Sequence, residues 1–138
     1  MKFFKKFRKS EKNTVEKGRS AEKTVAKYLL SKGWEISEMN FTIRGGEIDI
    51  VAKKGDELIF VEVRSWKKKY WPGGTPLETI TPAKIRHIIK TAKFYIKQKH
   101  ISLQKTRVRF DVAALTENSR GHWDIDYIEH AFDGDGKV

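Results

Sequence analysis

Two adjacent β-type runs in the middle of the chain constrain its fold more than any other feature. Residues 47–54 and 57–65 flank the turn Lys54-Gly55-Asp56, so they predict an antiparallel β-hairpin. The second run is apolar on both faces, which is typical of a central strand covered from both sides. The chain should therefore fold around a sheet with further structure on each face.

Three charged side chains interrupt this apolar hairpin. Period-two geometry places Glu62 and Arg64 on the face of Leu58 and Phe60, and Asp49 interrupts an apolar pair on the partner strand. An unpaired buried carboxylate is costly, so Asp49 and Glu62 require a compensating cation. Arg64, a buried lysine or a divalent metal could supply it. The alternative without function is an ion pair at the rim of the sheet.

The spacing of these residues resembles a known nuclease motif. The motif consists of Asp49 followed, after twelve residues, by Glu62-Val63-Arg64. It is similar to the D…(D/E)-x-K motif of the PD-(D/E)XK superfamily. A longer series resembles the YraN-type family, which is similar to archaeal Holliday-junction resolvases. That series is Gly18-x-x-x-Glu22, Gly46-Glu47-Ile48-Asp49, Phe60-Val61-Glu62-Val63, Thr81-Pro82-x-Lys84 and Arg109-Phe110-Asp111. The resemblance covers residues 18–132.

The resemblance implies a fold, a metal and a reaction. The fold is α/β, with a restriction-endonuclease-like αβββαβ core whose mixed central sheet is flanked by helices. Glu22, Asp49 and Glu62, with the Val63 carbonyl, are implied as ligands of Mg²⁺ or Mn²⁺ in hydrolysis of phosphodiester bonds in DNA, branched DNA included. Glu22 is alternatively a first-turn acid favoured by the helix dipole. Junction-cutting relatives are symmetric dimers, so a homodimer is also implied.

The chain departs from the superfamily pattern at Arg64, where a lysine is usual. A guanidinium stays protonated, so it can orient groups and stabilise charge but cannot take a proton from water. Lys84 matches a family position and is the candidate to replace the missing lysine. If the replacement fails, the same fold would bind nucleic acid without cleaving it.

The remaining patterns predict one domain over residues 18–132. A helical pattern runs from Thr14 or Gly18 to Ser31, and a strand follows before the hairpin. Thr81 as N-cap and Pro82 at the next position open a second helix that runs to about Lys99. Two strands around a turn at 117–121 complete the order helix, three strands, helix, two strands.

The formal net charge of +11 predicts an anionic partner, either nucleic acid or an acidic membrane surface. A loop and the second helix carry the candidate contacts to nucleic acid. These are Lys67, Lys68, Lys69 and Trp71 in the loop, and Arg86, Lys90, Lys93 and Lys97 on the helix. Residues 81–100 contain no acid, so nothing within the helix compensates its like charges. A simply solvated face is the alternative.

Composition also limits the class of protein. The chain has no cysteine, which excludes disulfides, thiolate zinc sites and a catalytic thiol. It has no apolar run near the ~20 residues of a membrane span and no secretory h-region, so a cytoplasmic location follows by default. Residues 1–17 and 133–138 read as a basic N-terminal tail and a C-terminal tail. Through residues 1–17 the protein could instead act as a basic membrane-surface or ribosome-associated protein.

Overall fold

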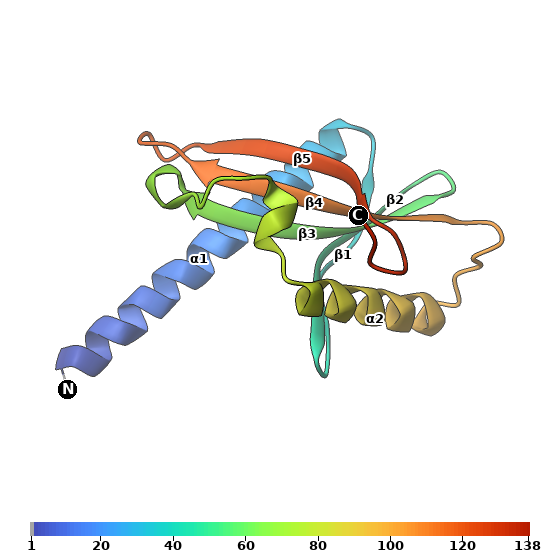
Figure 1. The fold of residues 1–138 in the computed structure, drawn as a ribbon, viewed down its shortest axis with the longest axis horizontal. Coiled ribbons are helices and arrows are strands. Elements are labelled where there is room, and N and C mark those ends of the chain that lie inside the picture. Colours follow the sequence, from blue (N-terminus) through green and yellow to red (C-terminus); the bar gives the residue numbers. More distant parts are fainter. Residues whose placement is uncertain (1) are drawn as a thin grey trace.

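The computed structural model describes the backbone of residues 2–138 and the side chains of residues 16–138. Five strands form one mixed sheet, and two helices lie against it (Figure 1). The elements in chain order are α1 (Lys2–Ser31), β1 (Glu35–Ile43), β2 (Gly46–Lys54), β3 (Glu57–Lys67), the 3₁₀ turns η1 (Lys68–Tyr70) and η2 (Pro76–Thr79), α2 (Pro82–Gln98), β4 (Arg107–Glu117) and β5 (Trp123–Phe132). The predicted α/β class and mixed sheet are confirmed.

The strands follow one another across the sheet in the order β1-β2-β3-β4-β5. All neighbours are antiparallel except β3 and β4, which pair in parallel from Glu57↔Arg107 to Lys67↔Glu117. A parallel pair needs a crossover, and α2 with the segment around it provides one. The predicted three-strand meander and the central position of β3 are therefore both present.

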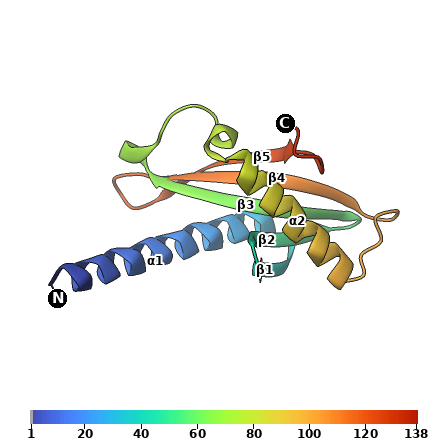
Figure 2. The same cartoon turned by 60° about the horizontal axis from the view of Figure 1, so that its bottom comes forward.

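Each face of the sheet is covered by one helix, which Figure 2 shows from a second direction. The core under α1 contains Ala21, Val25, Leu29, Trp34, Ile50, Ala52, Ile59, Val61, Ala113 and Leu115. The core under α2 contains Ile48, Val51, Leu58, Phe60, Ile85, Ile88, Ala92, Tyr95, Phe110, Val112 and Phe132, among others. Because β3 contributes to both cores, its apolar residues are buried on both sides, as its sequence predicted.

The first helix is longer than the sequence predicted. It begins at Lys2, not at Thr14 or Gly18, and its N-terminal part projects beyond the sheet (Figure 1). Residues 2–17 contain no proline or glycine and are rich in lysine, which favours helix. Residues 2–17 are thus helical, whereas the predicted domain boundary at residue 18 stays a prediction. The proposed contacts of its phenylalanines and lysines fall outside the described side chains.

The second helix begins as predicted. The Thr81 hydroxyl accepts a hydrogen bond from the backbone N–H of Lys84 at 3.1 Å, and Pro82 occupies the first turn. The helix ends at Gln98, within one residue of the predicted end. Within the described chain, no helix is long and apolar enough to cross a membrane.

Candidate active site

The two acids of the hairpin lie where β2 and β3 stop pairing. The ladder between these strands ends at Ile50↔Val61, and the same register continued by one step would place Asp49 opposite Glu62. Ile48 packs in the core under α2, whereas Ile50 packs in the core under α1. A regular strand would place both isoleucines on one face. We conclude that β2 twists at Asp49 and separates there from β3.

The Asp49 carboxylate accepts a hydrogen bond from a backbone N–H of β3 at the point where the β2–β3 ladder has ended. The backbone N–H of Val63 donates to Asp49 Oδ2 at 2.8 Å. Burial raises the pKa of Asp49 to about 6, and the nearby Glu22 and Glu47 carboxylates contribute to the rise. The hydrogen bond from Val63 and the charge of Lys84 oppose it. Asp49 is therefore a carboxylate in the gap between two strands, and part of the Asp49 population keeps its proton near pH 6.

Glu62 is the more deeply buried acid of the pair, with only 6% of its surface exposed. Burial raises its pKa to about 8, and the Asp49 carboxylate adds to this effect, against the charges of Lys84 and Arg64. Lys84 Nζ lies 3.8 Å from Glu62 Oε1 and is the cation paired with it. Within the described chain, the Glu62 carboxylate accepts no hydrogen bond, so its burial is poorly compensated.

Another buried acid, Asp111, shows what full compensation looks like. The residue is 1% exposed, and its carboxylate accepts hydrogen bonds from Arg109 Nε at 2.8 Å, Arg109 Nη2 at 3.0 Å, the Tyr127 hydroxyl and the backbone N–H of His130 at 2.9 Å. These donors satisfy both carboxylate oxygens, as in a structural ion pair. Asp49 and Glu62 lack such a set of donors, which distinguishes them as a candidate for chemistry.

Arg64, the cation at the motif position, is held in place by contacts with neighbouring residues. Its Nη2 donates to the Thr79 carbonyl at 3.3 Å, and its guanidinium lies 5.4 Å from the centre of the Trp66 ring. Its Nε is buried without a hydrogen-bond partner in the described chain. Of the two cations that influence Glu62, Lys84 is the one in an ion pair with it. The role of Lys84 as the substitute for the motif lysine stays a prediction.

The predicted three-carboxylate metal group is not formed. Glu22 is half-buried on α1, and burial raises the pKa of its carboxyl group, while the nearby Asn40 side chain opposes the rise. It is near enough to Asp49 to raise the pKa of that group. Among the side chains of residues 16–138, however, no three acids or histidines form a group that could hold a metal ion. The role of Glu22 as a ligand stays a prediction.

Two acids suffice for one class of metal site. Mg²⁺ keeps several waters and is commonly held by one or two carboxylates together with substrate phosphates. Asp49 and Glu62 are two hard-oxygen donors whose mutual repulsion and burial favour an added positive charge. The donor set therefore fits Mg²⁺ or Mn²⁺ held by two carboxylates. A contribution from the Val63 carbonyl stays a prediction.

The predicted nucleic-acid contacts occupy two surfaces. Arg86, Lys90, Lys93 and Lys97 are all exposed on α2, and none forms an ion pair with an acid that the structure describes. Lys67, Lys68 and Lys69 are exposed at the end of β3 and in η1. Trp71 is instead half-buried, with its ring edge-to-face against Trp66 at 4.7 Å between centroids. Its predicted role in base stacking stays a prediction.

Two contributors to this region were missed from the sequence. The Val63 amide that holds Asp49 cannot be found from side-chain patterns, because it depends on the end of the β2–β3 ladder. Arg120 lies in the predicted turn between the last two strands and lines a hollow together with Lys67, Lys68 and Lys69. The parallel register Lys67↔Glu117 brings them together, and a parallel register is not visible in local sequence.

Comparisons with known proteins agree with the family predicted from the motifs. The sequence profile of the uncharacterised protein family UPF0102 matches residues 21–115. A UPF0102 protein of Persephonella marina is 40% identical over 119 residues, which are 86% of this chain and 95% of that protein. One of Clostridioides difficile is 45% identical over 100 residues, 72% of this chain and 84% of that protein. One of Coxiella burnetii is 37% identical over 116 residues, 84% of this chain and 94% of that protein.

Proposed function

The chain belongs to the uncharacterised protein family UPF0102, and we propose that it is a divalent-metal-dependent endonuclease that hydrolyses phosphodiester bonds in DNA. The proposal includes the finer fold assignment, a restriction-endonuclease-like core of the PD-(D/E)XK type. The observation that carries it is the pair formed by the half-buried Asp49 and the buried Glu62, two carboxylates with raised pKa values at the point where two central strands separate. Buried acids with perturbed pKa values are common at functional sites.

The chain's own residues have separable roles in this reaction. Asp49 and Glu62 would hold Mg²⁺ or Mn²⁺, which when bound lowers the pKa of a water and neutralises charge on the phosphate. The Val63 amide fixes the orientation of Asp49. Lys84, whose ammonium is 3.8 Å from Glu62 Oε1, places a positive charge where the scissile phosphate gains negative charge. Arg64 contributes charge from a fixed position, because Thr79 and Trp66 hold its guanidinium.

The basic surfaces would bind DNA without reading its sequence. The cations of α2 begin two residues after Lys84 and continue along the exposed side of the helix. Their spacing along a rigid helix suits contacts to a phosphate backbone, which position a duplex but carry no base information directly. We therefore expect substrate choice to depend on DNA structure and not on base sequence.

One observation favours a second function. Arg64 cannot act as a base, and its side chain is already engaged. A protein of the same fold that binds nucleic acid without cutting it would keep the basic surfaces and lose the need for the carboxylate pair.

A cleavage assay separates the two functions. The purified protein is incubated with end-labelled branched, single-stranded and duplex DNA in Mg²⁺, in Mn²⁺ and in EDTA. We expect cleavage of at least one substrate with metal, none in EDTA, and a loss of at least about 1,000-fold in Asp49→Ala and Glu62→Gln. Glu129→Gln is the matched control, because Glu129 is an exposed acid on β5.

Two outcomes would contradict the nuclease proposal. Cleavage that survives Asp49→Ala would come from another site or another protein. Binding of DNA by the wild type without cleavage under any metal condition would favour the binding function. A symmetric cut across a junction needs two copies of this single carboxylate pair, so we also propose a homodimer on junction DNA. Sedimentation of the protein with and without a four-way junction tests that proposal.

A further inference from the structure

The strongest feature outside the carboxylate pair is a basic hollow at one end of the sheet. Its volume is about 890 Å³, and it lies between the end of β3 with η1 and the tip of the β4–β5 hairpin. Four cations line it, Lys67, Lys68, Lys69 and Arg120, against one acid, Glu117. Lys17 of α1 lies 3.8 Å from Glu117 Oε2, so that acid is already paired. The hollow is therefore suited to an anion.

Both walls of the hollow are held in place by the fold. On one side, the Asn118 side chain accepts hydrogen bonds from the backbone N–H groups of Arg120 at 2.9 Å and His122 at 3.1 Å. These bonds fix the hairpin tip that presents Arg120. On the other side, Trp66 precedes η1 and Trp71 follows it, and the edge-to-face contact between their rings connects the two ends of this segment. The cations are thus displayed on ordered backbone, which lowers the entropy cost of binding.

An exposed aromatic ring lies next to these cations. Tyr70 is 65% exposed, and Lys69 Nζ lies 5.0 Å from the centre of its ring. Trp66 and Trp71 are half-buried and pack against each other, so Tyr70 is the most exposed aromatic ring of this segment. An exposed ring beside phosphate-binding cations is the arrangement that proteins use for unpaired bases.

We propose that Tyr70, Lys67, Lys68, Lys69 and Arg120 form a subsite for single-stranded nucleic acid, in which Tyr70 stacks on an unpaired base while the cations bind the phosphates beside it. The subsite rests on the proposed function only in that the protein meets nucleic acid. Glu62 and Lys67 are five residues apart on β3, about 17 Å, so a strand leaving the carboxylate pair reaches the hollow within a few nucleotides. A duplex has no unpaired base to offer and should gain little from Tyr70.

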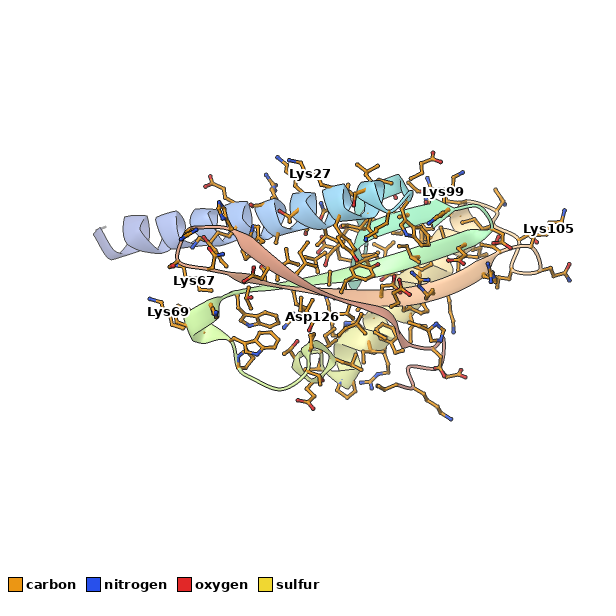
Figure 3. All side chains as sticks on the ribbon, turned by 90° about the horizontal axis from the view of Figure 1, so that it is seen from above. Lys27, Lys67, Lys69, Lys99, Lys105 and Asp126 are labelled. Atoms are coloured by element: carbon orange, nitrogen blue, oxygen red, sulfur yellow. The ribbon has the colours of Figure 1, made fainter. Side chains whose placement is uncertain are left out.

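The test measures binding without catalysis. Fluorescence anisotropy in EDTA is recorded with a labelled thymidine oligomer, its ribose equivalent, an abasic oligomer of equal length and a duplex. Tyr70→Leu removes the ring, Tyr70→Trp keeps a ring, and Arg120→Gln removes one cation. Lys105→Gln is the control, since Lys105 is exposed at the opposite end of the molecule from Lys67 and Lys69 (Figure 3). The ribose arm shows whether the subsite distinguishes RNA from DNA.

We expect Tyr70→Leu to weaken binding of the thymidine oligomer at least about 5-fold, with Tyr70→Trp near wild type. The abasic oligomer and the duplex should change by less than about 2-fold in the same variant. Arg120→Gln should reduce the slope of log affinity against log salt by roughly 0.7, the value for one phosphate contact on a single strand. Lys105→Gln should leave all four ligands unchanged.

Two results would contradict the proposal of this subsite. Equal binding of the thymidine and abasic oligomers by the wild type would mean that the hollow accepts any polyanion, an acidic protein or membrane included. A loss in Tyr70→Leu that is as large for duplex as for single strand would mean that Tyr70 does not read an unpaired base. Neither result depends on cleavage. A protein that cuts DNA but shows these results keeps the nuclease function, and one that cuts nothing but behaves as expected keeps the subsite.

Discussion

At the scale of single residues, the poorly compensated burial of Glu62 makes the stability of the protein depend on pH. The pKa of Glu62 is raised from 4.5 to about 8 in the folded state. Between these values the folded protein holds a proton that the unfolded chain releases, so the free energy of unfolding falls as pH rises through this window. Below about pH 4.5 both states are protonated and the effect disappears.

Glu62→Gln should therefore stabilise the metal-free protein at alkaline pH. Glutamine keeps the shape of the side chain but cannot ionise, so the variant escapes the cost of a buried charge. We expect the free energy of unfolding to rise by about 1–3 kcal/mol at pH 8.5 and to change little at pH 4.5. Urea unfolding at both pH values in EDTA measures the difference. A variant less stable than wild type at pH 8.5 would mean that Lys84 compensates Glu62 more fully than burial penalises it.

Lys84 should matter more for cleavage than Arg64. Lys84 forms an ion pair with Glu62 at 3.8 Å, whereas Arg64 is held by the Thr79 carbonyl and the Trp66 ring. We expect Lys84→Gln to lower the single-turnover cleavage rate about 100-fold, and Arg64→Gln to lower it by much less. Because Lys84 lowers the pKa of Glu62, its loss should also shift the pH–rate profile to higher pH.

The pH profile separates this role from a structural one. A variant that merely unfolds part of α2 would lose rate at every pH without moving the profile. Lys84→Arg keeps the charge and should recover part of the rate. Equal losses in Lys84→Gln and Arg64→Gln with unshifted profiles would count against Lys84 as the substitute for the motif lysine.

At the scale of elements, the β1–β2 hairpin is fixed to α2 by a close contact at Gly46. A Cβ atom added at Gly46 would lie 1.9 Å from Thr91 Oγ1 and 3.2 Å from the His87 carbonyl oxygen. We expect Gly46→Ala to destabilise the protein by about 1–3 kcal/mol, as other overpacked sites do. Thermal unfolding measures this. Thr91→Ala combined with Gly46→Ala should restore part of the loss.

Gly134→Ala is the matched control for this contact, because an added Cβ there meets nothing within 4 Å. If Gly46→Ala were as mild as Gly134→Ala, the hairpin would have to shift away from α2 at little cost. Since β2 also carries Asp49, such a shift would move the candidate site as well.

Most helices and strands could be predicted from the sequence, and the signal that allowed each prediction differs between elements. Thr81 and Pro82 mark the start of α2 by local chemistry, so that boundary was predicted correctly. The start of α1 was not, because Asn13 and Thr14 are N-cap residue types and Gly18 follows them, so signals typical of a helix start lie inside the helix that begins at Lys2. Alternation placed Glu62 on the α2 side correctly, since β3 pairs regularly along its length with β4.

The geometry of the candidate site was harder to predict from the sequence, because it depends on an irregularity in strand β2. Period-two reasoning assumes a regular strand, but β2 changes faces between Ile48 and Ile50. Asp49 is therefore in the gap beside β3, bonded to the Val63 amide, and not simply on one face of the sheet. Spacing pointed to the two acids and the family resemblance to Lys84, whereas the side-chain positions that decide whether Glu22 joins them depend on how α1 packs on the sheet, which local sequence does not show.

At the scale of the whole molecule, a net charge of +11 is divided between separate surfaces. Lys90, Lys93 and Lys97 are exposed on α2, and Lys23 and Lys27 are exposed on α1, which covers the other face of the sheet. Figure 3 shows Lys27 on the outer side of α1. If charge alone governed binding, the loss of cations from either helix would weaken it equally. If DNA docks beside the carboxylate pair, only the α2 surface should matter.

Triple substitutions distinguish these two cases. We expect Lys90→Gln, Lys93→Gln and Lys97→Gln together to weaken binding of a 20-base-pair duplex about 10-fold or more at 0.1 M salt. Each lost phosphate contact should reduce the magnitude of the slope of log affinity against log salt by roughly 0.9. The control, with glutamine at Lys23, Lys27 and Lys105, removes the same charge from other surfaces and should change neither quantity. Equal losses in both variants would show that the charge of the whole molecule, and not a docking surface, holds the DNA. The cations of α2 would then have no role in presenting a phosphate to Asp49 and Glu62.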